Sequence, residues 1–144
     1  MKVYIIAKDN FREYANNLND YIKNILKKDV LFFLKEDNLS YIKEIVNISE
    51  KIVLNNNKDR LITIDESGGL GFCAAAKVKK MIVAQCADQH SAHMTREHNN
   101  ALGISLGADI TNIFIAKEIS KLFLETEFAA GRHMIRIDML NKLG

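Results

Sequence analysis

Several residue types and patterns that mark particular protein classes are missing from this sequence. It contains no proline and no tryptophan, and its only cysteines are Cys73 and Cys86. Because the N-terminus also lacks the pattern of a signal peptide, we expect a cytoplasmic protein with reduced, inert core thiols and no disulfide framework. No apolar run reaches the ~20 residues that a membrane span needs. The net charge of +2 is too small to indicate a nucleic-acid or membrane partner.

The remaining composition is that of a globular protein. The chain has 144 residues, of which 48% are hydrophobic and 26% charged, which is enough to bury a core. We therefore expect a single domain over residues 1–144. In the absence of proline, breaks between elements are read from glycine, asparagine and aspartate.

Short apolar runs alternate with stretches of helical periodicity along the chain. The runs predict β-strands at residues 2–7, 30–34, 61–64, 81–86 and 102–106. Helices are expected at residues 11–26, 41–48, 72–77, 91–98, 113–123 and 134–140, with Ser40 or Asn38 capping the second and Thr111 or Asn112 the fifth. This alternation predicts an α/β, Rossmann-like three-layer fold, in which helices cover both faces of a five-stranded parallel sheet. We expect the flavodoxin-like strand order 2-1-3-4-5.

The most informative local motif follows the third predicted strand. That strand ends on two acids, Asp65 and Glu66, and a glycine-rich turn leads into the next helix. Backbone N–H groups and the helix dipole both favour an anion at such a turn. The turn is either a ligand site or a tight connection without a ligand. In the first case the binding residues are Ser67, Gly68, Gly69 and Gly71.

Asp9 lies at the equivalent place after the first predicted strand. In the expected strand order, the topological switch point falls between strands one and three, and ligands bind beyond the carboxyl ends of the strands at that point. The sequence therefore predicts that Asp9 and residues 65–71 meet at one crevice.

Two arginines near the C-terminus suit a small phosphorylated ligand. Neither a dinucleotide fingerprint nor a nucleoside-triphosphate loop is present, so a large nucleotide cofactor is not expected. Arg132 and Arg136 are four residues apart on a predicted helix, and guanidinium groups bind phosphate oxygens in pairs. The alternative is a pair of solvated surface arginines.

Histidine is concentrated between His90 and His98. The helical positions of His90, His93, Glu97 and His98 do not complete a metal site, so no metal is expected. His98 is either an acid–base residue beside the amide of Asn99 or part of an ordinary helix end.

Taken together, these motifs resemble the family that contains ribose-5-phosphate isomerase B and the two subunits of galactose-6-phosphate isomerase. The resemblance rests on Asp9, the glycine turn ending in Lys77, and the runs Arg96-Glu97-His98-Asn99-Asn100 and Gly131-Arg132-His133-x-x-Arg136. Residues 91–101 and 136–142 are most similar to the A-subunit branch of the family.

The resemblance implies an aldose–ketose isomerase that acts on a sugar phosphate through an enediol, without metal or other cofactor. In the family, the histidine at the place of His98 opens the sugar ring with help from Asn99. The arginines at the places of Arg132 and Arg136 hold the phosphate. The family site lies between two subunits, so His98 would serve a neighbour's glycine turn.

One departure from the family pattern leaves three hypotheses open. Members with a complete site carry Cys-Gly-Thr-Gly where this chain has Asp65-Glu66-Ser67-Gly68, and that cysteine moves the proton between C1 and C2. Asn10 also stands where the isomerase B pattern has histidine. The chain is therefore an A-type subunit that pairs with a cysteine-bearing paralogue, a homodimeric isomerase that uses Asp65 or Glu66 as base, or a sugar-phosphate-binding subunit without turnover.

Overall fold

The computed structural model describes residues 1–143, apart from the side chains of Arg132 and His133. Five parallel strands form one sheet: β1 (Lys2–Lys8), β2 (Asp29–Lys35), β3 (Arg60–Asp65), β4 (Val83–Gln85) and β5 (Gly103–Gly107). The α-helices are α1 (Arg12–Asp20), α2 (Asn38–Leu54), α3 (Gly69–Ala76), α4 (Gln89–Asn99), α5 (Ile113–Glu125) and α6 (Arg132–Lys142). A 3-10 turn, η1 (Asp9–Phe11), precedes α1, and a π-helical turn, η2 (Tyr21–Ile25), follows it.

The strand order is β2-β1-β3-β5-β4, so the expected order 2-1-3-4-5 is wrong at its last two places. All five residues of β5 are buried, and β5 ends on Gly107 directly beneath Ser67 of the glycine turn. β4 has only three residues and ends on the exposed Gln85, which suits the edge of a sheet. The switch point between β1 and β3 is nevertheless confirmed, because Ala7 of β1 pairs with Ile64 of β3.

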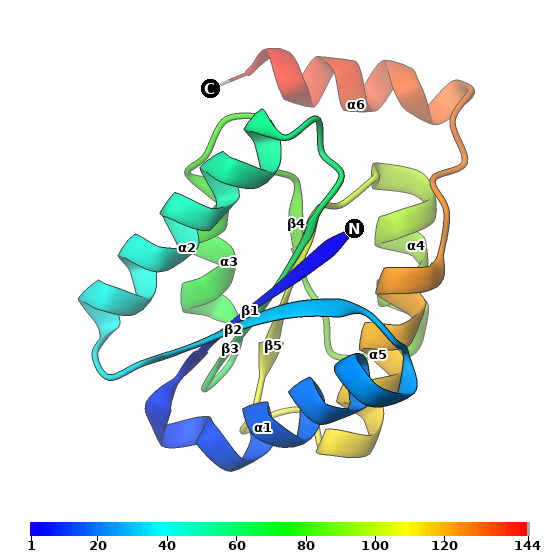
Figure 1. Cartoon of the computed structure of the whole chain (residues 1–144). Coiled ribbons are helices and arrows are strands. Elements are labelled where there is room, and N and C mark those ends of the chain that lie inside the picture. Colours follow the sequence, from blue (N-terminus) through cyan, green and yellow to red (C-terminus); the bar gives the residue numbers. More distant parts are fainter. Residues whose placement is uncertain (144) are drawn as a thin grey trace.

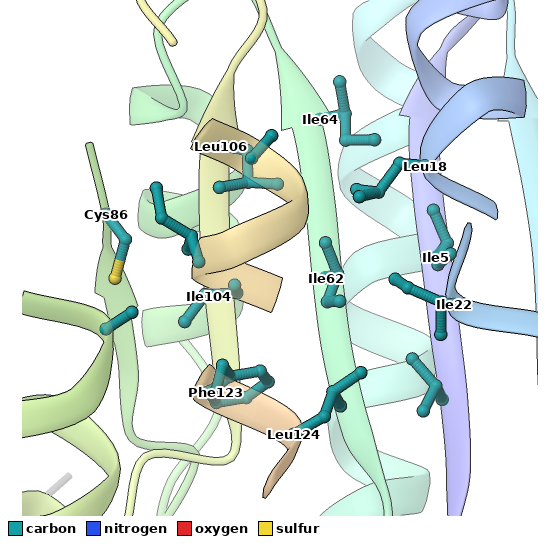
Figure 2. Close-up of a cluster of buried hydrophobic side chains, with 14 of the residues drawn as sticks. Ile5, Leu18, Ile22, Ile62, Ile64, Cys86, Ile104, Leu106, Phe123 and Leu124 are labelled. Carbon is teal, nitrogen blue, oxygen red and sulfur yellow. The ribbon is translucent and has the colours of Figure 1, made fainter. Parts of the chain in front are cut away.

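The predicted three-layer arrangement is confirmed (Figure 1). One face of the sheet packs against α1, α4 and α5, and Figure 2 shows Leu18 and Phe123 packed there over Ile5, Ile62 and Ile104. The other face packs against α2 and α3, whose buried side chains include Tyr41, Ile45, Ile48, Ala74 and Ala75. The side chains of β1 alternate between the two cores, as a strand buried on both faces requires.

The N-caps of α2 and α5 lie at or next to the residues that the sequence predicted. Asp37, not Ser40 or Asn38, caps α2, and its carboxylate accepts the N–H of Ser40 at 2.7 Å. Asn112 caps α5 by accepting the N–H of Ile115, which selects one of the two predicted residues. Both side chains satisfy an N–H group that has no partner within the helix.

The exposure of one cysteine and the position of α6 were not predicted from the sequence. Cys86 is buried as expected, but Cys73 is exposed on α3. Figure 1 shows α6 apart from the two helical layers, across the end of the molecule where β1 begins. No helix within residues 1–143 is both long and apolar enough to cross a membrane.

Candidate active site

The carboxylate of Asp65 organises the glycine turn at the carboxyl end of β3. Its Oδ1 accepts the N–H of Gly68 at 2.6 Å, and its Oδ2 accepts the N–H of Gly71 at 2.9 Å and the hydroxyl of Tyr41 at 2.7 Å. Asp65 is only 2% exposed. The N–H of Gly69 donates to Ser67 Oγ at 3.1 Å. Three of the N–H groups that a ligand at this turn would use are therefore bound to oxygen atoms of the chain itself.

Tyr41 is a site residue that the sequence analysis missed. It lies on α2, and its ring occupies the apolar face that the helical periodicity had predicted. Burial, followed by the charge of Asp65, raises the pKa of its hydroxyl far above the ordinary value of 10.0. Tyr41 therefore stays protonated and acts as a permanent donor to Asp65.

The turn is also fixed from beneath by the neighbouring strands. Thr63 donates to Ser105 Oγ at 2.8 Å, and Ser105 donates in turn to the carbonyl of Gly68. The side chain of Gln85 donates to the carbonyl of Ser67 at 2.7 Å. A Cβ atom on Gly71 would lie 2.2 Å from Thr63 Oγ1, so only glycine allows this approach. Side chains from β3, β4 and β5 thus fix the position of the turn at the carboxyl end of the sheet.

The other two acids at this edge are paired with basic side chains. Glu66 Oε2 lies 3.1 Å from Lys8 Nζ, and the Glu66 side chain is 52% exposed. The hydrogen bond from Lys8 lowers the pKa of Glu66 below its ordinary value. Asp9 forms an ion pair with Arg12 one turn further on. Asp65 ends β3 and Asp9 follows the adjacent strand β1, so the two acids lie at neighbouring strand ends, as predicted.

His98 and Asn99 lie in the last turn of α4 and are partly exposed. The helix ends at Asn100, which adopts a left-handed conformation with φ of 52°. The chain then enters β5 beside the start of β4, where the N–H of Leu102 donates to the carbonyl of Ile82 at 2.7 Å. His98 is therefore at the amino end of the sheet.

The start of α6 lies beside the end of α4. The N–H of Ala129 donates to the carbonyl of Glu97 at 2.9 Å, three residues before α6 begins at Arg132. Arg136 follows one turn later and is exposed. The side chain of Arg132 is outside the described part of the chain.

The predicted site residues thus form two groups at opposite ends of the sheet. Asp9, Asp65, Glu66 and the glycine turn lie at the carboxyl end, whereas His98 and the start of α6 lie at the amino end. α4 connects the two ends, and a helix of its length spans about 16 Å. Within one chain, His98 and the glycine turn cannot contact the same small ligand.

Two side chains one turn apart on the histidine-rich helix are in contact with each other and with the residue that follows α5. His93 Nε2 lies 2.6 Å from Glu97 Oε2, and Nδ1 of the same ring lies 3.2 Å from Thr126 Oγ1. Among the described residues, no group of three or more histidine, cysteine or acidic side chains is arranged to hold a metal ion.

Comparison with known proteins gives a consistent assignment. The model of the ribose/galactose isomerase family matches residues 3–140. The chain is 43% identical to the galactose-6-phosphate isomerase subunit LacA of Streptococcus mutans over 132 residues, covering 90% of this chain and 92% of that relative. It is 38% identical to the subunit of the same name from Staphylococcus epidermidis, again with 90% and 92% covered.

Solved structures share the fold. Ribose-5-phosphate isomerase B of Clostridium thermocellum superposes with a TM-score of 0.87 at 25% identity, covering 99% of this chain and 96% of that one. The Mycoplasma genitalium enzyme with bound ribulose-5-phosphate has the same TM-score at 23% identity, with 98% and 94% covered. With the family model matched along almost its whole length and close relatives covering nine-tenths of it, this chain belongs to the ribose/galactose isomerase family.

Proposed function

We propose that this chain is the A-type subunit of a galactose-6-phosphate isomerase and works with a paralogous subunit that carries the proton-transfer cysteine. The substrate assignment rests on the relatives named as galactose-6-phosphate isomerase subunits, which are 38–43% identical over most of the chain. The reaction moves a hydrogen from C2 to C1 of the sugar and interconverts an aldose and a ketose.

The separation of the two residue groups is the observation that carries the proposal. His98 and the start of α6 lie at one end of the sheet, and the glycine turn lies at the other. A site that uses both groups requires two chains, each giving one end. In such a pair, His98, Asn99, Arg132 and Arg136 of this chain would serve the glycine turn of the partner.

Each residue then has a distinct chemical task. His98 protonates the ring oxygen of the cyclic sugar or accepts the anomeric proton, and Asn99 orients the hydroxyl. The thiolate of the partner removes the C2 proton and returns it to C1 by way of an enediol. Arg132 and Arg136 hold the phosphate, since paired guanidinium groups match its oxygen atoms.

The chemistry of Asp65 and Glu66 supports a partner-dependent enzyme over a self-sufficient homodimer. A carboxylate base for an enediol reaction works best when its pKa is raised toward neutrality. Glu66 has a lowered pKa because Lys8 donates to it. Asp65 is buried beneath the turn with three hydrogen bonds to its oxygen atoms.

Replacing His98 in the mixed enzyme tests the proposal. We expect His98→Ala, combined with a Cys-Gly-Thr-Gly partner, to lower turnover of cyclic galactose-6-phosphate by about 10²–10⁴-fold, the usual value of acid–base help. An open-chain substrate analogue should lose much less, because it needs no ring opening. His90→Ala is the matched control, since His90 is an exposed residue at the opposite end of the same helix.

Two results would overturn the proposal. A mixture no more active than the partner alone would argue against a subunit role, and so would a His98→Ala mixture as active as the His90→Ala control. The phosphate contact is tested separately by ligand titration. Arg136→Ala should weaken binding by about 1.5–3 kcal/mol, whereas Lys142→Ala on the same helix should not.

A further inference from the structure

Arg96 is a buried cation held by neutral oxygen atoms. The residue is 4% exposed. Its guanidinium donates to the side-chain oxygen of Asn100 at 2.7 Å, to the carbonyl of Ala101 at 2.8 Å and to the carbonyl of Thr126 at 3.3 Å. Within the described part of the chain, Arg96 has no carboxylate at ion-pair distance.

Such an arrangement is costly for stability alone. Burial lowers the pKa of the guanidinium to about 10, and the nearby charge of Arg60 contributes to this shift. An apolar side chain of similar size would avoid this desolvation, because buried charges are often replaceable without loss of stability. Unlike an apolar side chain, the guanidinium has several donors in a fixed geometry, so it can hold several acceptors in defined positions.

Two of the three acceptors, on Asn100 and Ala101, directly follow the helical turn that carries His98 and Asn99, and the third, on Thr126, follows α5. The N–H of Asn100 donates to the carbonyl of Arg96 at 3.2 Å, while the Arg96 guanidinium donates to the Asn100 side chain. These reciprocal bonds fix both ends of the segment 96–100. The bond to Thr126 joins that segment to the end of α5.

We propose that Arg96 is the positioning residue for ring opening, and that its bonds to Asn100, Ala101 and Thr126 hold His98 and Asn99 in the orientation in which they meet the sugar of a partner chain. This inference rests on the proposed function. Arg96 itself does not reach the ligand, because it is buried behind the turn. Misplacing a catalytic group by about 1 Å can cost ~10²-fold in rate, so a loosened turn would be visible in turnover.

The test uses two variants that weaken the same contact differently. Arg96→Met removes the charge and all three bonds. Asn100→Gly keeps the buried cation and allows the left-handed turn, but removes the side-chain acceptor. In the mixed enzyme, we expect both to lower kcat for the cyclic sugar phosphate by roughly 10–100-fold with little change in KM.

Arg60→Met is the matched control. Arg60 is a partly buried guanidinium that donates to the carbonyls of Asn57 and Asp59, each at 2.9 Å, and therefore stabilises a different turn. It should lower the melting temperature without the selective loss of kcat. An Arg60→Met enzyme that loses as much kcat as Arg96→Met would reduce Arg96 to a general structural role.

Two further readouts separate positioning from stability. Turnover of an open-chain analogue should be spared in both variants, and adding Arg96→Met to His98→Ala should cause almost no further loss for the cyclic substrate. Additive losses, or equal losses for both substrates, would overturn the inference. Normal kcat in Arg96→Met and Asn100→Gly, with a large loss in His98→Ala, would overturn it while leaving the proposed function intact.

Hydrogen exchange gives an answer that does not depend on activity. The N–H groups of Asn100 and Ala101 donate to the carbonyls of Arg96 and Thr95. They should exchange faster in Arg96→Met than in Arg60→Met. Unchanged protection would refute the claim that Arg96 holds the turn, even if the wild-type mixture proved inactive and the proposed function failed.

Discussion

Replacing Asp65 distinguishes a carboxylate that supports the glycine turn from one that transfers a proton. Asp65 accepts three hydrogen bonds, from the N–H groups of Gly68 and Gly71 and from the hydroxyl of Tyr41, and it is 2% exposed. Asp65→Ala leaves all three donors without this acceptor. If the carboxylate is structural, the main effect is a loss of stability in the chain alone.

The size of the loss follows from these contacts. Hydrogen bonds to charged groups contribute about 1.5–3 kcal/mol each, and buried donors without partners cost ~1–3 kcal/mol. The three bonds share one carboxylate, so they do not add, and we expect Asp65→Ala to lower the free energy of unfolding by roughly 3–5 kcal/mol. At ~3 °C per kcal/mol for a chain of this size, the melting temperature should fall by about 10 °C or more.

Urea unfolding followed by circular dichroism measures this effect. Tyr41→Phe is the matched control, because it removes one donor and leaves both N–H groups bound; it should cost only about 1 kcal/mol. The double variant should lose less than the sum of the two, since both changes remove the same bond. An Asp65→Ala protein with the wild-type urea midpoint but strongly reduced turnover in the mixed enzyme would refute the structural role and favour Asp65 as a base.

Three further predictions concern other parts of the fold. A thiol reagent should modify the exposed Cys73 in the native chain but not Cys86, whose pKa burial raises to about 12; rapid modification of both would contradict this. The hydrogen bond from the N–H of Ser91 lowers the pKa of Asp88, so stability from this cap is present above the ordinary pKa of 3.8 and is lost as the pH falls through the lowered folded value. The melting temperature of Asp88→Asn should therefore decline less in acid than that of the wild type, and parallel curves would disprove the effect. Gly107→Ala should cost roughly 1–3 kcal/mol in urea unfolding, because its Cβ would lie 2.6 Å from the Ser67 backbone; an unchanged midpoint would show that the turn can move.

The sheet was predictable from the sequence up to the point where packing decides between strands. Apolar runs alternating with helical periodicity fix a parallel sheet, and the switch point between β1 and β3 follows from the first three strands. The order of β4 and β5 is not visible in the periodicity. In the structure β5 is the strand beside β3, and its Gly107 approaches the backbone of Ser67, a contact between residues 40 positions apart that no local pattern reports.

The candidate site was predictable as a set of residues but not as a set of contacts. Asp65 was identifiable by its place after a strand, whereas its bond to Tyr41 joins residues 24 positions apart. Tyr41 fits the apolar face of α2, so its hydroxyl gave no separate signal. Cys73 was misassigned to the core because the alanine-rich stretch of α3 shows no polar face in sequence.

The hydrogen bonds within the glycine turn support the proposal that this chain works with a second subunit. A helix N-terminus with free N–H groups attracts an anion, and in this chain the carboxylate of Asp65 fills that place from within. The turn is thereby complete without a ligand, and its acid is engaged in holding the backbone. His98, at the other end of the sheet, lies in a partly exposed turn that Arg96 fixes from behind. The N–H groups of Gly68 and Gly71 thus have an acceptor within the chain, and His98 lies partly exposed at the amino end of the sheet. These contacts support the proposal that the shared site takes the amino end of the sheet from this chain, and the glycine turn with its proton-transfer group from a partner chain.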